Sequence, residues 1–396
     1  MKFTIKDIDV FITTHNRAPL LAETIESVLA NTIVPDRIIV LDNESTDNTE
    51  QVCRLYENKN VVYIKTFGKY GNFYKSKEIA SRKYLIRLHD DNLINCHFFE
   101  KILFMLNKYK NISIASMSYR LFFTGYPKSF PYLDITDKIK NFYSKRPLGK
   151  DIVLINNDKE YMVELIKKYT DRTLPKIGGT PFHVEKTEVF KDYQPQTEKY
   201  GKADDVAIFL FALKHGRYVY LNDTDSAFFR AHPNRDSETD ENSLDLNQVE
   251  NLVSLYTKPF KNDTDPEIWK GFFCLFYGIF PTFLKNGLRK EYPNKALLEH
   301  LFKRGILPPF VADFYNEDEV LRNVNKINID QRKVYESYLS VKKNALQNVF
   351  WDNISGIERI FSVKNFTKNG IKRKYLILFN HRIYLGKVKN KKKDPS

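Results

Sequence analysis

Two adjacent aspartates, Asp90 and Asp91, follow the apolar run Tyr84–His89, and Asn92 comes directly after them. A parallel strand that ends in two carboxylates places them where open α/β sheets bind ligands. Carboxylate oxygens in that position suit a hard divalent cation, which in turn suits a nucleotide diphosphate. Adjacent aspartates are also common in ordinary strand-to-loop turns, so the pair gains its weight from motifs elsewhere in the chain.

The elements that must position these aspartates alternate between strand and helix signals. Strands are predicted at residues 9–14, 37–42, 61–65 and 84–88, and helices at 19–29, 45–56 and 73–82. Pro19 suits a first helical turn, and Ser45 is predicted as the N-cap of the second helix. Repeated strand–helix–strand units imply an α/β fold, with a mostly parallel sheet and right-handed crossovers.

The rest of the chain divides into a mixed stretch and an α-rich stretch. Strands are expected at 112–117 and 218–221, and helices at 158–169, 205–215, 244–257, 294–304 and 330–348. The apolar stretch 271–284 is expected to be a buried core helix. We therefore expect an α/β catalytic domain over residues 1–240, an α-rich extension over 241–360 and a basic tail over 361–396.

The excess of basic residues is concentrated in the tail. Lys plus Arg exceed Asp plus Glu by 14 in the whole chain, and residues 361–396 hold eleven Lys or Arg against the single acid Asp394. Two short apolar strands with a hairpin turn at Asn380-His381 are expected there. Anionic headgroups attract each nearby basic residue by about 1 kcal/mol, so the tail is a candidate for contact with an anionic membrane surface. The alternative is a solvated cationic end that aids solubility.

The cysteines, the first residues and the longest apolar stretch together predict the cellular compartment. The three cysteines, Cys53, Cys96 and Cys274, are far apart, which argues against a disulfide framework or a structural zinc and fits a reducing environment. The first residues have no signal-peptide architecture. The stretch 271–284 is shorter than the ~20 residues of a spanning helix. We expect a cytoplasmic protein that the tail brings to the inner face of the cell membrane.

Four segments of the chain line up with one known family. They are residues 11–17, 38–49, 88–92 and 203–206. This pattern resembles the family 2 glycosyltransferases of bacterial surface-polysaccharide type, which have the Rossmann-like GT-A nucleotide-diphospho-sugar transferase fold. The second segment is the most specific, with Asp42 ending a strand and Ser45 to Thr49 forming the family's helix cap, although Asn43 and Glu44 replace the more usual Asp and Gly. The resemblance covers roughly the first 235 residues.

The resemblance implies a nucleotide site at the ends of the first two strands. Thr13 and Thr14 would turn hydroxyls and amides toward the nucleotide, and Asp42 would accept the N3–H of a uracil ring. A carboxylate at the start of a helix is also favoured by the helix dipole, which is the alternative explanation for Asp42. The implied nucleotide-binding residues are Thr13, Thr14, Asn16, Arg17, Asp42 and Asp90.

The resemblance also implies a site for Mn²⁺ or Mg²⁺. Asp90-Asp91 matches the family's metal motif, although the usual pattern is Asp-x-Asp, and Asp91 is the implied direct ligand. His232, in the segment Arg230-Ala-His-Pro, would complete the metal shell, unless it is a plain surface histidine. The metal would stabilise the charge that builds on the leaving nucleoside diphosphate.

A catalytic base is implied at the start of a later helix. Asp204-Asp205 matches the family's Glu-Asp motif, and Asp205 would deprotonate the acceptor hydroxyl in a single inverting displacement. The alternative is a pair of acids that serves the helix dipole. Gly178, Gly179 and Thr180, together with Asp204, are expected to face the donor sugar and acceptor, although a Gly-Gly turn is common anywhere.

These residues predict an inverting, metal-dependent glycosyltransferase that moves a sugar from a nucleotide-diphospho-sugar, most often UDP-linked, to a glycan or lipid-linked glycan of the cell surface. A non-catalytic membrane- or polyanion-binding protein on the same scaffold is one alternative. A nucleic-acid partner is disfavoured, because Asp42, Asp90 and Asp91 would repel a polyanion. A sugar nucleotidyltransferase is also disfavoured, because residues 13–17 contain no glycine for a phosphate loop.

Overall fold

The computed structural model describes most of the N-terminal three quarters of the chain and three strands near its end. The described residues are 2–68, 70–123, 152–170, 182–201, 204–222, 226–231, 244–284, 286–323, 361–368, 371–378 and 381–387.

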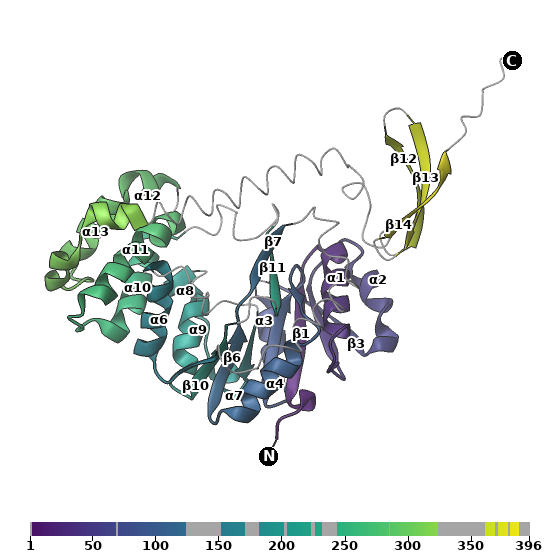
Figure 1. The fold of residues 1–396 in the computed structure, drawn as a ribbon, viewed down its shortest axis with the longest axis horizontal. Coiled ribbons are helices and arrows are strands. Elements are labelled where there is room, and N and C mark those ends of the chain that lie inside the picture. The colour runs from purple at the N-terminus through teal and green to yellow at the C-terminus, as the bar shows by residue number, and fades with distance from the viewer. Residues whose placement is uncertain are drawn as a thin grey trace.

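The centre of the molecule is an eight-stranded sheet with the order β3-β2-β1-β4-β9-β6-β10-β8 (Figure 1). Strands β9 and β8 run antiparallel to their neighbours, and the other pairs are parallel. The predicted mostly parallel α/β sheet is therefore confirmed. The strands are β1 (Ile8–Thr14), β2 (Ile38–Asn43), β3 (Val61–Thr66), β4 (Tyr84–His89), β6 (Ile112–Met117), β8 (Ile152–Ile155), β9 (His183–Lys186) and β10 (Arg217–Leu221).

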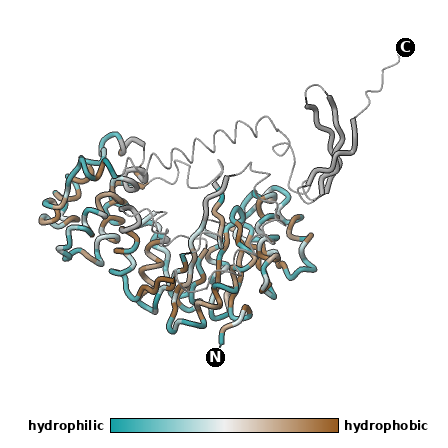
Figure 2. Tube along the Cα trace, in the orientation of Figure 1, coloured by the Kyte–Doolittle hydropathy of each residue, from teal (hydrophilic) through white to brown (hydrophobic). Residues whose placement is uncertain are grey.

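Both faces of the sheet are buried, which explains why its inner strands are continuous apolar runs. Phe11 and Leu41 belong to the hydrophobic cluster on one face, whereas the residues before them in each strand, Val10 and Val40, belong to the cluster on the other. Figure 2 shows hydrophobic residues concentrated in this interior. Helices α1 (Ala18–Leu29), α2 (Thr49–Arg54) and α4 (Phe98–Lys108) cover one face, and α3 (Gly71–Ile79), α6 (Asp158–Thr170), α7 (Thr187–Asp192) and α9 (Asp204–Ala212) cover the other.

A group of helices follows the sheet and extends one of its two cores. They are α10 (Leu246–Thr257), α11 (Pro266–Phe283), α12 (Asn286–Glu291) and α13 (Asn294–Lys303), with the short helix α8 (Thr197–Tyr200) beside α10. Trp269 of α11 is fully buried and packs edge-on against Phe260 and Phe272. The buried helix expected at 271–284 is thus part of the longer α11. The helix expected at 330–348 lies outside the described residues, and the boundaries of the three parts remain a prediction.

Two small sheets complete the described structure. In the first, β11 (Ala227–Ala231) pairs antiparallel with β5 (Leu93–Ile94) and parallel with β7 (Arg120–Phe123). The second is the antiparallel sheet of β12 (Phe361–Lys368), β13 (Ile371–Leu378) and β14 (His381–Lys387), which Figure 1 shows apart from the main sheet. Leu378 pairs with His381, so the expected hairpin is confirmed, and β12 is an additional strand.

The helix after β2 starts later than predicted, so the assignment of Ser45 as its N-cap is wrong. Helix α2 begins at Thr49, and Asp47 accepts hydrogen bonds from the Thr49 amide and hydroxyl. Ser45 instead donates its hydroxyl to Asp42 at 2.5 Å. The reason is that Asp42 is buried at the strand end and needs a nearby donor, which the first hydroxyl of the loop supplies.

No helix within the described residues is long and apolar enough to cross a membrane.

Candidate active site

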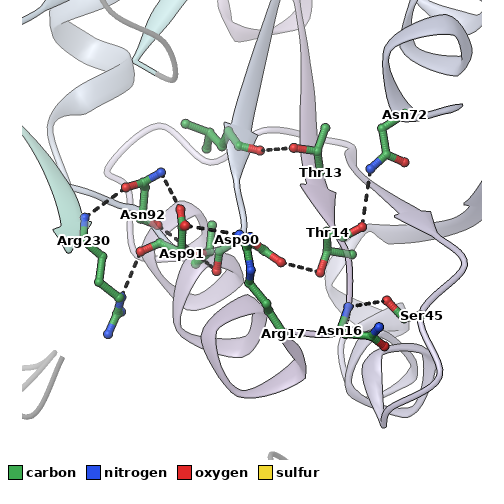
Figure 3. Close-up of polar contacts among 12 residues, drawn as sticks. Thr13, Thr14, Asn16, Arg17, Ser45, Asn72, Asp90, Asp91, Asn92 and Arg230 are labelled. Atoms are coloured by element: carbon green, nitrogen blue, oxygen red, sulfur yellow. Dashed lines mark hydrogen bonds and ion pairs between the residues drawn. The ribbon is translucent and has the colours of Figure 1, made fainter. Parts of the chain in front are cut away.

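The ends of β1, β2 and β4 bring three of the predicted segments to one edge of the sheet. Thr14 pairs with Asp42 across β1 and β2, and Thr13 pairs with His89 across β1 and β4. The amide of Asp90 donates to the carbonyl of Thr13 at 3.1 Å. The predicted nucleotide and metal residues of these strands therefore lie together, and Figure 3 shows Thr13, Thr14, Asp90 and Asp91 among them.

Asp90 and Asp91 are both buried, and one guanidinium lies between them. Nη1 of Arg17 is 2.9 Å from Oδ1 of Asp90 and 3.2 Å from Oδ2 of Asp91 (Figure 3). The other oxygens accept hydrogen bonds from the Thr14 hydroxyl at 2.6 Å and from the Asn92 side-chain amide at 2.7 Å. All four carboxylate oxygens therefore have donors in the protein.

The burial of Asp90 has an electrostatic consequence. Desolvation raises the pKa of its carboxyl group to about 7, although Arg17 and the Thr14 hydroxyl favour the charged form. Asp91, as a like charge next to it, adds to the upward shift of the pKa. The two carboxylates thus lie in a place that favours the presence of a cation.

The loop that carries the two aspartates is fixed by residues from distant parts of the sequence. The Thr24 hydroxyl of α1 is 2.8 Å from the carbonyls of both Asp90 and Asn92. Arg230 of β11 donates its amide to Oδ1 of Asn92 at 3.1 Å and its Nε to the carbonyl of Asp91 at 2.8 Å (Figure 3). The guanidinium also forms an ion pair with Glu23 of α1 at 2.5 Å. This role of Arg230 was missed in the sequence, where the segment was noted for His232.

The loop after β2 is fixed by its own residues and by residues of β3 and the end of β1. Asp42 accepts hydrogen bonds from the Ser45 amide and hydroxyl, and from the Tyr63 hydroxyl at 2.6 Å. Asn16 joins this loop to the end of β1, because its amide donates to Ser45 at 2.8 Å and its side-chain oxygen accepts from the Thr46 amide at 2.7 Å. Nδ1 of His15 also lies 2.6 Å from the carbonyl of Asn43. Tyr63 and His15 were not predicted as site residues.

The start of α3 closes this side of the site. The side chain of Asn72 accepts from Thr66 at 2.6 Å and lies 3.4 Å from the carbonyl of Thr14. A Cβ at Gly71 would lie 2.8 Å from Oδ1 of Asn43, so a larger residue here would require the Asn43 side chain to shift.

The predicted base lies at the start of α9, where Asp204 and Asp205 are the first two residues. The carboxylate of Asp204 accepts hydrogen bonds from the Tyr193 hydroxyl at 2.5 Å and the Gln196 amide at 3.0 Å, and desolvation raises its pKa. The side chain of Asp205 lies outside the described part of the structure, as do Gly178, Gly179, Thr180 and His232 in full.

The donor set fits a hard divalent cation. Mg²⁺ is commonly bound by one or two carboxylates together with substrate phosphates and water, so Asp90 and Asp91 suffice without further protein ligands. Among the described residues, no group of three or more His, Cys, Asp or Glu side chains could hold a metal ion. The Arg17 guanidinium already shows that both carboxylates can share one positive charge.

Comparison with known proteins gives a family for the first part of the chain and a fold for the whole. Residues 9–149 match the model of glycosyl transferase family 2, which covers 141 of the 396 residues. This segment contains β1 to β4 and both aspartates of the buried pair. No curated protein matches the sequence.

Comparison with solved structures gives the fold of the chain. Residues 1–349 of TarS from S. aureus are 15% identical, with a TM-score of 0.50, and the match covers 98% of this chain and 100% of that one. The same fragment in complex with UDP-GlcNAc is 13% identical, with a TM-score of 0.50 and coverages of 97% and 99%. The mannosyltransferase PcManGT from Pyrobaculum calidifontis, in complex with GDP-Man and Mn²⁺, is 13% identical, with a TM-score of 0.40 and coverages of 88% and 88%.

These results confirm the predicted class. Residues 9–149 carry the family 2 glycosyltransferase sequence, and the chain has the GT-A fold of TarS. The family match over residues 9–149 supports a glycosyl transferase.

Proposed function

We propose that the protein is an inverting, metal-dependent glycosyltransferase that transfers a sugar from a UDP-linked donor to a hydroxyl group of a surface glycan. The observation that carries this proposal is the convergence of Thr14, Arg17, Asp90 and Asp91 at the end of β1 and β4. These residues lie within the segment that matches the family. A binding protein would leave this buried carboxylate pair without a use, and residues 13–17 lack the glycine that a nucleotidyltransferase phosphate loop needs.

The loop after β2 would hold the nucleoside. An ionised carboxylate offers about four acceptor positions, and Asp42 uses three of them for Ser45 and Tyr63. The remaining one is available for the N3–H of uracil. The UDP-GlcNAc complex of TarS, which has the same fold, supports a uridine nucleotide as the donor.

The pair Asp90 and Asp91 would hold Mn²⁺ or Mg²⁺ against the diphosphate, and His232 is proposed as a further ligand. A bound cation supplies positive charge where the leaving diphosphate becomes more negative. Thr24 and Arg230 contribute by holding the Asp90–Asn92 loop in place before the donor binds. Such preorganisation avoids the cost of ordering the loop during the reaction.

Asp205 is proposed as the base that removes the proton from the acceptor hydroxyl. Asp204 has its own partners, Tyr193 and Gln196, which supports a role in fixing the start of α9. Asp204, Gly178, Gly179 and Thr180 are proposed to line the sugar site. Asp205→Asn should keep binding UDP and lose transfer by about a thousandfold, within the range of general-base catalysis. Isothermal titration and an assay of UDP release measure the two properties separately, and normal transfer by this variant would remove Asp205 from its role.

The C-terminal sheet is proposed to contact an anionic membrane from the cytoplasmic side. Residues 361–396 hold eleven Lys or Arg against the single acid Asp394, together with several aromatic residues. This composition is typical of membrane interfaces. The full chain should sediment with vesicles of anionic lipid at low salt and remain in solution with vesicles of neutral lipid. Equal behaviour with both vesicles would exclude this role.

The reaction itself can be tested with a panel of UDP-sugars and Mn²⁺. We expect UDP to be released from one donor, and the product to have the opposite anomeric configuration by NMR. Retention of configuration would contradict the inverting mechanism. Release of pyrophosphate from UTP and a sugar phosphate would show a nucleotidyltransferase instead.

A further inference from the structure

The buried carboxylate pair already has a positive partner that belongs to the chain. Arg17 reaches both Asp90 and Asp91 with one nitrogen, at 2.9 and 3.2 Å. Its side chain is 17% exposed, whereas those of the aspartates are 1% and 8% exposed. Ionised carboxylates at such burial are costly without a counter-charge, and the guanidinium supplies it.

A divalent cation would need the same oxygens that Arg17 contacts. The other two oxygens accept from Thr14 and Asn92, whose hydrogen bonds hold the carboxylates in orientation. A cation on the side of Oδ1 of Asp90 and Oδ2 of Asp91 would lie where the guanidinium is, and two positive charges at that distance repel each other.

The backbone of Arg17 is fixed, so an exchange of cations would move only its side chain. Its carbonyl accepts hydrogen bonds from the amides of Leu20 and Leu21 in the first turn of α1. The next residue, Ala18, donates its amide to Asp47 at 3.0 Å. The displaced guanidinium would therefore remain at the junction of β1 and α1, beside the loop that Asn16 joins to Ser45 and Thr46.

We propose that Arg17 is a built-in counter-ion of the metal site. It competes with the divalent cation for Asp90 and Asp91, and it turns to the diphosphate of the donor when the cation binds. This inference rests on the proposed function. The planar guanidinium matches the geometry of phosphate oxygens, so its release and the arrival of the donor favour each other. The arrangement makes the protein bind the metal weakly alone and tightly together with the nucleotide.

The test compares Mn²⁺ binding by four forms of the full chain: wild type, Arg17→Gln, Arg17→Lys and Arg54→Gln. Arg54 is a matched control, because it is an exposed arginine of α2 that pairs with Glu50. Without nucleotide, Arg17→Gln should bind Mn²⁺ about tenfold more tightly than wild type, because the hydrogen bonds of the guanidinium to Asp90 and Asp91 no longer compete with the metal. Electron paramagnetic resonance measures this affinity. Arg17→Lys should lie between the two, and Arg54→Gln should equal wild type.

Thermal stability gives a second reading that does not depend on catalysis. In EDTA, Arg17→Gln should melt below wild type, because Asp90 and Asp91 lose their counter-charge, and Mn²⁺ should raise its Tm more than that of wild type. UDP should strengthen Mn²⁺ binding to wild type by a larger factor than to Arg17→Gln, because only in wild type does the diphosphate draw a competing guanidinium away from the carboxylates. By reciprocity, Mn²⁺ should strengthen UDP binding by the same factor in each protein.

Three results would overturn the inference. The first is that Arg17→Gln binds Mn²⁺ no more tightly than wild type, and the second is that no form binds Mn²⁺. The third is that wild type binds UDP equally well in EDTA while Arg17→Gln loses UDP binding, which would mean that the guanidinium replaces the metal permanently. The comparison with Mn²⁺ alone involves no nucleotide, so a failure of the proposed donor would appear separately, as absent UDP binding by every form.

Discussion

The loop after β2 and the loop after β4 carry neighbouring parts of the candidate site, but they are held in different ways. Asp42 is fixed by Ser45, three residues later, and by Tyr63 on the adjacent strand. The Asp90–Asn92 loop is fixed by α1 and by Arg230, which is 138 residues from Asn92 in sequence. The proposed nucleoside side thus depends on contacts within the loop and with adjacent strands, and the proposed metal side on contacts between segments far apart in the sequence.

Because the two loops are held differently, mutations in them should have different effects. A change in the first loop should alter recognition of the base and little else. A change in the supports of the second loop should affect folding and metal binding together, because its hydrogen bonds join β4, α1 and β11.

The largest effect is expected for Arg230→Ala. It removes the ion pair with Glu23 and the Nε donor to the carbonyl of Asp91. Because Glu23 is partly exposed, we expect the loss to cost about 2 kcal/mol, which urea denaturation can measure. Mn²⁺ binding should weaken in parallel. Arg87→Ala is an informative comparison, because it also breaks a pair with a buried acid, Glu185, away from this loop. Equal loss of Mn²⁺ binding in both variants would contradict a specific role for Arg230.

A second prediction concerns the pH dependence of stability in EDTA. Burial raises the pKa of Asp90 from 3.8 to about 7, so between these values the folded protein holds a proton that the unfolded chain has lost. The corresponding stability is full below pH 3.8 and disappears as the pH rises through about 7. Asp90→Asn should therefore reduce the fall in Tm across this interval. If both proteins showed the same pH profile, Asp90 would not be the titrating group.

The smallest effect is expected for Tyr63→Phe. It removes one hydrogen bond to Asp42 and leaves the two from Ser45. Stability should fall by about 1 kcal/mol, and UDP affinity should change while Mn²⁺ affinity does not. A matched loss of Mn²⁺ binding would show that the two loops are not independent.

The same contrast explains what could be predicted from the sequence. Strands β1 to β4 are contiguous apolar runs that end in polar residues, and their parallel order places Thr14, Asp42 and Asp90 at one edge. Local patterns are sufficient for that inference. Strands β5 and β11 are short and pair across more than a hundred residues, so neither their sheet nor the contacts of Arg230 have a local signal.

Other misses have physical reasons of the same kind. Helix α4 was not predicted, because its N-cap, His97, makes no side-chain cap hydrogen bond and the sequence has no usual start signal. Ser45 has the residue type of a cap, but the buried carboxylate of Asp42 takes its hydroxyl. The roles of Asp91, Asp205 and His232 remain predictions that rest on family resemblance and on position.

The most direct test of the central claim is thermal stability against a panel of nucleoside diphosphates, with and without Mn²⁺. Ligands that bind the folded state raise the Tm by mass action. We predict a rise with UDP that requires Mn²⁺ and is lost in Asp91→Ala, whose unfolding in EDTA remains cooperative. No response to any nucleotide, together with a rise in Tm with oligonucleotides or anionic lipid, would contradict the account and indicate a binding protein.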